Sequence, residues 1–231
     1  MNKAILSFRY PEYAHRLKSL GYDVIPSETI DRFIPYERDH ADMQCLIIDD
    51  TAFVLEKCGR LSDILSGNYN VITCGEFVDG KYPLNVPLNA AVTGDHIIAK
   101  TNALDKKVVS YGKINGYKLI DVNQGYAKCS CAVVYDNAVI TADKGIYSAL
   151  KNTDIDVQLI GQGSIRLEGA EYGFIGGASG YDKETETLYF CGDIKSHPDY
   201  GIIKDFCNKY NTKTVSLTPG PVTDIGGIIF C

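Results

Sequence analysis

The order strand, strand, helix, strand recurs along this chain, and it limits the possible folds more than any other feature. An apolar run at 131–135 leads to a turn at Asp136-Asn137 and then to a second run at 138–141. Asp143 opens a helix that should extend to Leu150, and a strand is predicted at 157–160. Short strands that alternate with single helices indicate an α/β fold built from small mixed sheets.

The same order is expected at both ends of the chain. Towards the C-terminus we expect strands at 174–176 and 187–191, a helix at 198–210 and a strand at 214–217. At the N-terminus we expect a strand at 4–8, a helix at 12–20 that Gly21 ends, and a strand at 23–25.

Turn residues recur at a similar spacing. Pro87 lies 38 residues before Gly125, and Gly125 lies 38 residues before Gly163, whereas Gly220 follows after a longer gap. A repeat of several tens of residues is typical of units that stack or surround an axis. Each of these sites shares few residues, so a chance similarity is the alternative. The length of 231 residues suits one large domain or two small ones.

Composition excludes several functional classes. The 231 residues carry 23 basic and 29 acidic side chains, for a net charge of −6, which disfavours a nucleic-acid partner. Arg9 interrupts the first apolar stretch, and no apolar run has the length of a membrane span, so we expect a cytoplasmic protein without a membrane partner. The eight cysteines lie mostly in apolar runs and are interpreted as reduced core thiols.

Cys129 and Cys131 are the closest pair of cysteines. On a strand both thiols would face the same side, where two further ligands could complete a metal site. The sequence offers no such ligands, so we nominate neither a metal site nor a cofactor, and the role of this pair stays open.

The chain ends in Gly226-Gly227-Ile228-Ile229-Phe230-Cys231, a β-branched strand that a sheet can hold in place. This stretch resembles the Gly-Gly-x-x-x-Cys segment of the guanidino-group-modifying enzymes, which share the pentein fold. Further similarity lies in segments 123–130, 172–180 and 192–199, so the resemblance covers about the last 110 residues. It implies a single domain over residues 1–231, an α/β, five-bladed ββαβ pseudo-symmetric propeller (pentein) around a central channel, with Cys231 as the nucleophile. The segments at Ala4, Leu46, Ala90, Val133 and Leu188 are the expected five copies of its unit. A loose terminal residue is the alternative for Cys231.

The chain departs from the family where the enzymes carry Gly-His-x-Asp. The corresponding segment here is Gly125-Tyr126-Ala127-Lys128, so the chain resembles a branch that lacks the His-x-Asp pair. A cation in place of an anion repels a guanidinium group, whereas an anionic or carbonyl-bearing ligand would suit Lys128. We expect Lys128 in the channel, with a solvated strand lysine as the alternative.

Other polar residues could complete the site. Asn89, Tyr126, Arg166, Glu168 and Asp224 are predicted substrate-binding residues, although Arg166 and Glu168 could instead pair with each other on one strand face.

His197 is a candidate catalytic residue that could move protons in place of the missing histidine. A capping role before the helix at 198 is its simpler interpretation.

Two functional hypotheses follow. The first is a thiol-dependent hydrolase or an amidinotransferase-like enzyme that acts on a small polar metabolite, with Cys231, Lys128 and His197 as its catalytic residues. The second is a non-catalytic ligand-binding or assembly protein that kept the channel. A purely structural domain is a third interpretation, since fold does not fix function. The sequence leaves catalysis and the formation of a homo-oligomer open.

Overall fold

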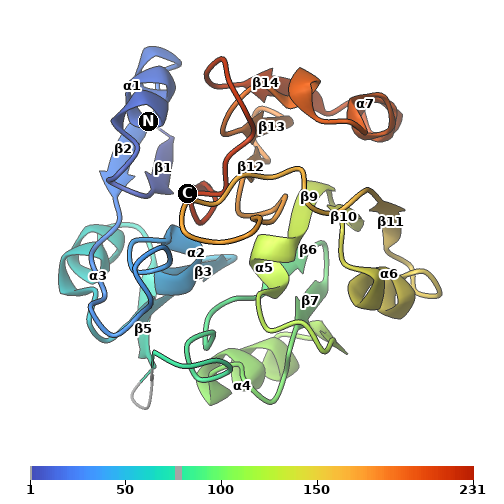
Figure 1. The fold of residues 1–231 in the computed structure, drawn as a ribbon. Helices are drawn as coiled ribbons and strands as arrows, with labels where there is room; N and C mark the ends of the chain where they lie inside the picture. Colours follow the sequence, from blue (N-terminus) through green and yellow to red (C-terminus); the bar gives the residue numbers. More distant parts are fainter. Residues whose placement is uncertain (1, 76–79) are drawn as a thin grey trace.

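The computed structural model describes residues 2–75 and 80–231, in which fifteen strands form five sheets of three strands each. In every sheet an inner strand pairs antiparallel with a middle strand, which pairs parallel with an outer strand. A helix connects each middle strand to its outer strand. Figure 1 shows the five sheets arranged in chain order around a centre, with these helices at the periphery.

We number the sheets as units one to five. The inner strands are β15 (Ile229–Phe230), β3 (Cys45–Ile48), β6 (Ala91–Thr93), β9 (Cys131–Tyr135) and β12 (Ser179–Asp182). The middle strands are β1 (Lys3–Leu6), β4 (Thr51–Leu55), β7 (His96–Ala99), β10 (Ala138–Thr141) and β13 (Thr187–Phe190). The outer strands are β2 (Asp23–Pro26), β5 (Asn70–Cys74), β8 (Lys118–Asp121), β11 (Asp156–Leu159) and β14 (Lys213–Ser216).

The connecting helices are α1 (Pro11–Ser19), α3 (Gly59–Leu65), α4 (Lys106–Ile114), α6 (Lys144–Leu150) and α7 (Tyr200–Lys209). Two short helices, α2 (Ala41–Gln44) and α5 (Ala127–Ser130), precede β3 and β9, and the 3-10 helix η1 (Ile194–Ser196) precedes α7. The Asp143 side chain caps α6 by accepting a hydrogen bond from the Ile146 N–H at 2.8 Å. Pro11 opens α1, whose end Gly21 follows with a φ of +96°.

Unit one is assembled from both ends of the sequence. Ala4 and Ile5 of β1 pair with Phe230 and Ile229 of β15, so the ring closes through an antiparallel pair. Buried apolar clusters fill the spaces between neighbouring units, and the largest of them joins units one, two and three. The ring is therefore held by packing between units as well as by this strand pair.

The structure confirms the predicted α/β architecture of five units. The strands at 131–135 and 138–141 have the predicted bounds, and each of the five segments expected to begin a unit falls in a different sheet or one residue before it. The recurring turn residues occupy equivalent places: Gly125, Gly163 and Gly220 each lie four residues after the end of an outer strand, and Pro87 lies in the corresponding connection between β5 and β6.

Two local predictions are wrong. Cys129 belongs to α5 and only Cys131 is on a strand, so the two cysteines do not share a strand face. Residues 174–176 form a turn region before β12 and not a strand. Gly176 in this turn region packs closely against two carbonyl groups. A β-carbon on it would lie 2.2 Å from the Lys128 oxygen and 2.3 Å from the Cys131 oxygen, so the position requires glycine.

Candidate functional site

A central cavity of about 530 Å³ lies between the five inner strands. Its walls are mainly apolar and include Leu46, Leu88, Val92, Val133 and Ile229. Its volume is within the range of small-molecule sites, which are mostly apolar with a few polar groups that fix the orientation of a ligand. The cavity is therefore the candidate functional site.

Lys128 is the charged residue at the end of the cavity where the inner strands begin, three residues before β9, and we call this end the floor. Its position is set by Asn89, whose side-chain oxygen accepts hydrogen bonds from the backbone N–H groups of Lys128 and Cys129 at 2.9 and 3.3 Å. The Lys128 Nζ donates to the Gly176 carbonyl at 3.0 Å. Among the described residues no carboxylate oxygen lies within 4.0 Å of this ammonium group, which has three protons to donate.

A buried polar cluster lies behind the floor. The Cys129 thiol donates to Asp42 Oδ2 at 3.0 Å, and the Asn89 amide donates to the Cys129 sulfur at 3.1 Å. Burial raises the pKa of Asp42 to about 6, although the charges of Lys128 and His40 oppose this shift. Burial and the neighbouring Asp42 and Asp224 raise the pKa of the Cys129 thiol well above its usual value, so this thiol is neutral. Cys129 does not line the cavity and therefore offers it no nucleophile.

Cys231 lines the cavity and is fixed by the sheet. Its backbone N–H donates to the Lys3 carbonyl at 2.9 Å, and its carbonyl accepts from the Lys3 N–H at 2.7 Å. Burial raises the pKa of its thiol to about 11; the charge of Lys3 lowers it and that of Asp23 raises it. The prediction that the sheet holds this residue is confirmed, but the surroundings stabilise the thiol and not the nucleophilic thiolate.

The predicted residues fall into separate groups. Lys128 and Cys231 line the cavity, whereas Asn89 and Asp224 are buried around its floor. Asp224 accepts hydrogen bonds from the backbone N–H groups of Phe174 and Gly226 at 2.9 and 3.0 Å, so it organises the turns before β12 and β15.

Tyr126 lies outside the cavity lining. Its hydroxyl accepts a hydrogen bond from the Asn85 amide at 2.9 Å, and its ring stacks between Tyr82 and Phe174. The same amide group donates to Glu37, whose pKa burial raises.

Three predictions do not agree with the structure. Arg166 and Glu168 are exposed, do not line the cavity and form no ion pair with each other in the described part of the chain. Arg166 forms only an isolated bridge with Thr223, so no sheet orients their side chains. His197 is buried away from the cavity; its Nδ1 accepts from the Asp199 N–H at 3.1 Å, and burial lowers its pKa. His197 thus has a local structural role in the loop before α7, in agreement with its simpler interpretation as a capping residue.

The sequence analysis did not identify Asp42 as a residue near the site. Ala41-Asp42-Met43-Gln44-Cys45 and Ala127-Lys128-Cys129-Ser130-Cys131 hold equivalent places, each forming a short helix that runs into an inner strand. Comparison of these two segments could have indicated that Asp42 and Lys128 approach the same centre.

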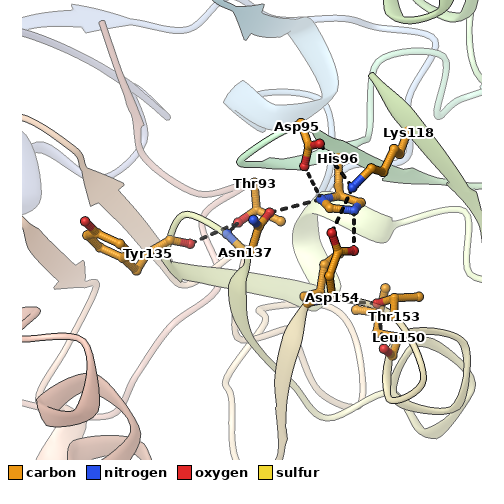
Figure 2. A network of polar contacts seen from close by, with 10 residues as sticks. Thr93, Asp95, His96, Lys118, Tyr135, Asn137, Leu150, Thr153 and Asp154 are labelled. Atoms are coloured by element: carbon orange, nitrogen blue, oxygen red, sulfur yellow. Dashed lines mark hydrogen bonds and ion pairs between the residues drawn. The ribbon is translucent and has the colours of Figure 1, made fainter. Parts of the chain in front are cut away.

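His96 lies in a polar network between units three and four (Figure 2). Its Nδ1 is 2.9 Å from Asp95, and its Nε2 is 2.8 Å from Asp154. The ligand atoms of these three residues lie within 4.8 Å of one another, as metal ligands would. However, the Lys118 ammonium group bridges both carboxylates at 3.1 and 2.8 Å, so this cation already balances their charge and the network joins the two units.

Known structures share this architecture. The chain resembles a DDAH from Pseudomonas aeruginosa, a Cys-to-Ser mutant complexed with citrulline, at a TM-score of 0.59 and 10% identity, covering 100% of this chain and 98% of that one. It resembles the agmatine deiminase of C. jejuni (TM-score 0.56, 9% identity, 93% and 87% covered). It also resembles an amidinotransferase from Microseira wollei in the saxitoxin biosynthetic pathway (TM-score 0.54, 11% identity, 94% and 76% covered).

Comparison by sequence identifies a family but no protein of known activity. No curated protein matches the chain significantly. No helix of the described residues is both long and apolar enough to cross a bilayer. The model of a family of unknown function (DUF6873) matches residues 5–229. The chain therefore belongs to the DUF6873 family, and its fold is the pentein fold of the guanidino-group-modifying enzymes.

Proposed function

We propose that this protein binds a small molecule in its central cavity and places an anionic or carbonyl oxygen of that molecule against Lys128 Nζ. The observation that supports this proposal is an ammonium group at the floor of an apolar cavity, with one carbonyl acceptor and no paired carboxylate in the described structure. In a partly dry site a charged donor gains more from an oxygen ligand than it would in water.

Catalysis through Cys231 is less well supported than binding. A thiol with a pKa of about 11 is almost entirely protonated at neutral pH, and only the thiolate attacks carbon efficiently. His197, the histidine proposed to move protons, does not reach the cavity. We therefore favour the hypothesis of a ligand-binding protein over that of a thiol-dependent enzyme.

The test is a binding screen with straight-chain carboxylates and their neutral primary amides, followed by thermal shift and titration calorimetry. Carboxylates should raise the unfolding temperature, because ligand at about 100 times its dissociation constant adds about 2.7 kcal/mol of stability. The amides should bind more weakly, since they lack the charge.

The variant Lys128→Met tests the floor directly. Loss of a charged hydrogen bond of about 1.5–3 kcal/mol should weaken carboxylate binding by roughly tenfold to a hundredfold. Lys204→Met, an exposed change on α7, is the matched control and should leave affinity unchanged. Equal carboxylate affinity in Lys128→Met and the parent protein would refute the proposal, as would a screen in which no carboxylate binds.

A further inference from the structure

The cavity has opposite charge at its two ends. Lys128 lies at the floor, whereas three carboxylates line the end where the inner strands finish, which we call the mouth: Asp49, Asp182 and Glu184. Asp49 and Glu184 are exposed to solvent there. None of these three has a Lys, Arg or His nitrogen within 4.0 Å among the described residues. The mouth therefore carries net negative charge that the surrounding protein does not pair.

Lys183 is the one lysine among the described residues that line the mouth, and its charge is already neutralised. Lys183 Nζ donates to the Asp136 carboxylate at 2.9 Å, and both residues lie in turns after inner strands. This ion pair leaves the other mouth carboxylates as the uncompensated charge. A cleft lined by one sign of charge attracts the opposite sign from solution.

Neutral donors hold the mouth carboxylates in place. The Tyr117 hydroxyl donates to Asp49 at 2.8 Å, and the Asn2 amide donates to Glu184 at 2.7 Å. Asp182 is buried and accepts from the Thr185 hydroxyl at 2.8 Å and from the Tyr22 hydroxyl. These bonds orient the carboxylates and leave their negative charge uncompensated.

The length of an inner strand separates the two ends. β9 begins at Cys131, three residues after Lys128, and Asp136 follows its last residue at the mouth. Five steps of about 3.3 Å each make roughly 16 Å, and the Lys128 side chain shortens the free path to about 10–15 Å. The walls between the two ends are mainly apolar.

We propose that the ligand of this cavity is a zwitterion with an apolar spacer: a carboxylate or similar anion at Lys128, and an ammonium or other cation at Asp49 and Glu184. This inference rests on the proposed function, because it assumes that the anion binds at the floor. It adds that the end of the ligand at the mouth is cationic, which the positive charge of Lys128 at the floor does not by itself require.

Three probes of equal length test the proposal by titration calorimetry: ω-aminooctanoate, octanoate and octylamine. At low salt, ω-aminooctanoate should bind about three- to tenfold more tightly than octanoate, since exposed charge pairs each contribute modestly. This advantage should shrink as salt screens the exposed carboxylates. Octylamine should bind most weakly, because it has no anion for Lys128.

Variants separate this proposal from the proposed function. The double variant Asp49→Asn, Glu184→Gln should remove the advantage of ω-aminooctanoate over octanoate, whereas Asp205→Asn, an exposed change on α7, should preserve it. If octanoate and ω-aminooctanoate bind equally in the parent protein, the zwitterion inference fails and the proposed function stands. If neither binds, or octylamine binds most tightly, the proposed function fails as well.

Discussion

Ionisation of Asp42 should make the protein less stable as the pH rises from acidic to neutral. The carboxyl is almost fully buried, its Oδ1 has no hydrogen-bond partner among the described groups, and its pKa is about 6 instead of the usual 3.8. Because the folded state then binds the proton more tightly than the unfolded chain does, the stability due to this proton is complete below pH 3.8 and is lost as the pH rises through 6.

The size of the effect follows from the two pKa values. A shift of about two units corresponds to about 3 kcal/mol once both states are ionised, near pH 7.5, and to about 1 kcal/mol near pH 4.5. Asn cannot ionise, and its side-chain oxygen can still accept the hydrogen bond from Cys129. The free energy of unfolding of Asp42→Asn, relative to the parent protein, should therefore rise by about 2 kcal/mol between these two pH values.

Urea unfolding at a series of pH values and constant ionic strength measures this difference. Asp205→Asn removes an exposed carboxylate and is the control for the change in net charge; its stability should follow the parent curve. Parallel curves for Asp42→Asn and the parent protein would mean that Asp42 ionises alike in both states, and the reasoning would be refuted.

Three further predictions concern packing and reactivity. Gly177→Ala should lower stability by about 2 kcal/mol, seen as a lower urea midpoint, because a β-carbon there would lie 2.2 Å from an Asp224 oxygen; an unchanged midpoint would show that the turn relaxes without strain. Cys231 should react with iodoacetamide at pH 8 on the order of a hundredfold more slowly than a free cysteine, as peptide mapping can measure, and equal rates would contradict its raised pKa. In thermal melts His96→Ala should destabilise the protein more than Lys118→Met, because the histidine is buried and the lysine is half exposed; the reverse order would count against a structural network.

Local chemistry made the unit predictable from sequence. Asp143 has a side-chain oxygen that can cap a helix, and the following apolar residues repeat with helical spacing, so α6 was found with its start correct. The strands on either side of Asn137 were equally clear because a tight turn separates two short apolar runs.

The contents of the site were less predictable, because they depend on contacts between units. Asp42 and Cys129 are 87 residues apart in the sequence, and only the closed ring brings their side chains to 3.0 Å. His96 meets Asp154 in the same way, across the boundary between units three and four. The prediction for Arg166 and Glu168 was wrong for a local reason. A strand-like pattern was expected to orient their side chains, but the segment belongs to none of the described sheets.

The ring also explains how one fold can present opposite charges to its centre. Asp42 in unit two and Lys128 in unit four occupy equivalent positions, so the backbone brings both towards the floor whatever side chain each carries. Asp42 is buried behind the floor and does not line the cavity, whereas Lys128 does, so the charge that a ligand meets at the floor is positive. In such a ring the sign of the preferred ligand depends on which of the equivalent side chains reaches the open space, and here that side chain is Lys128.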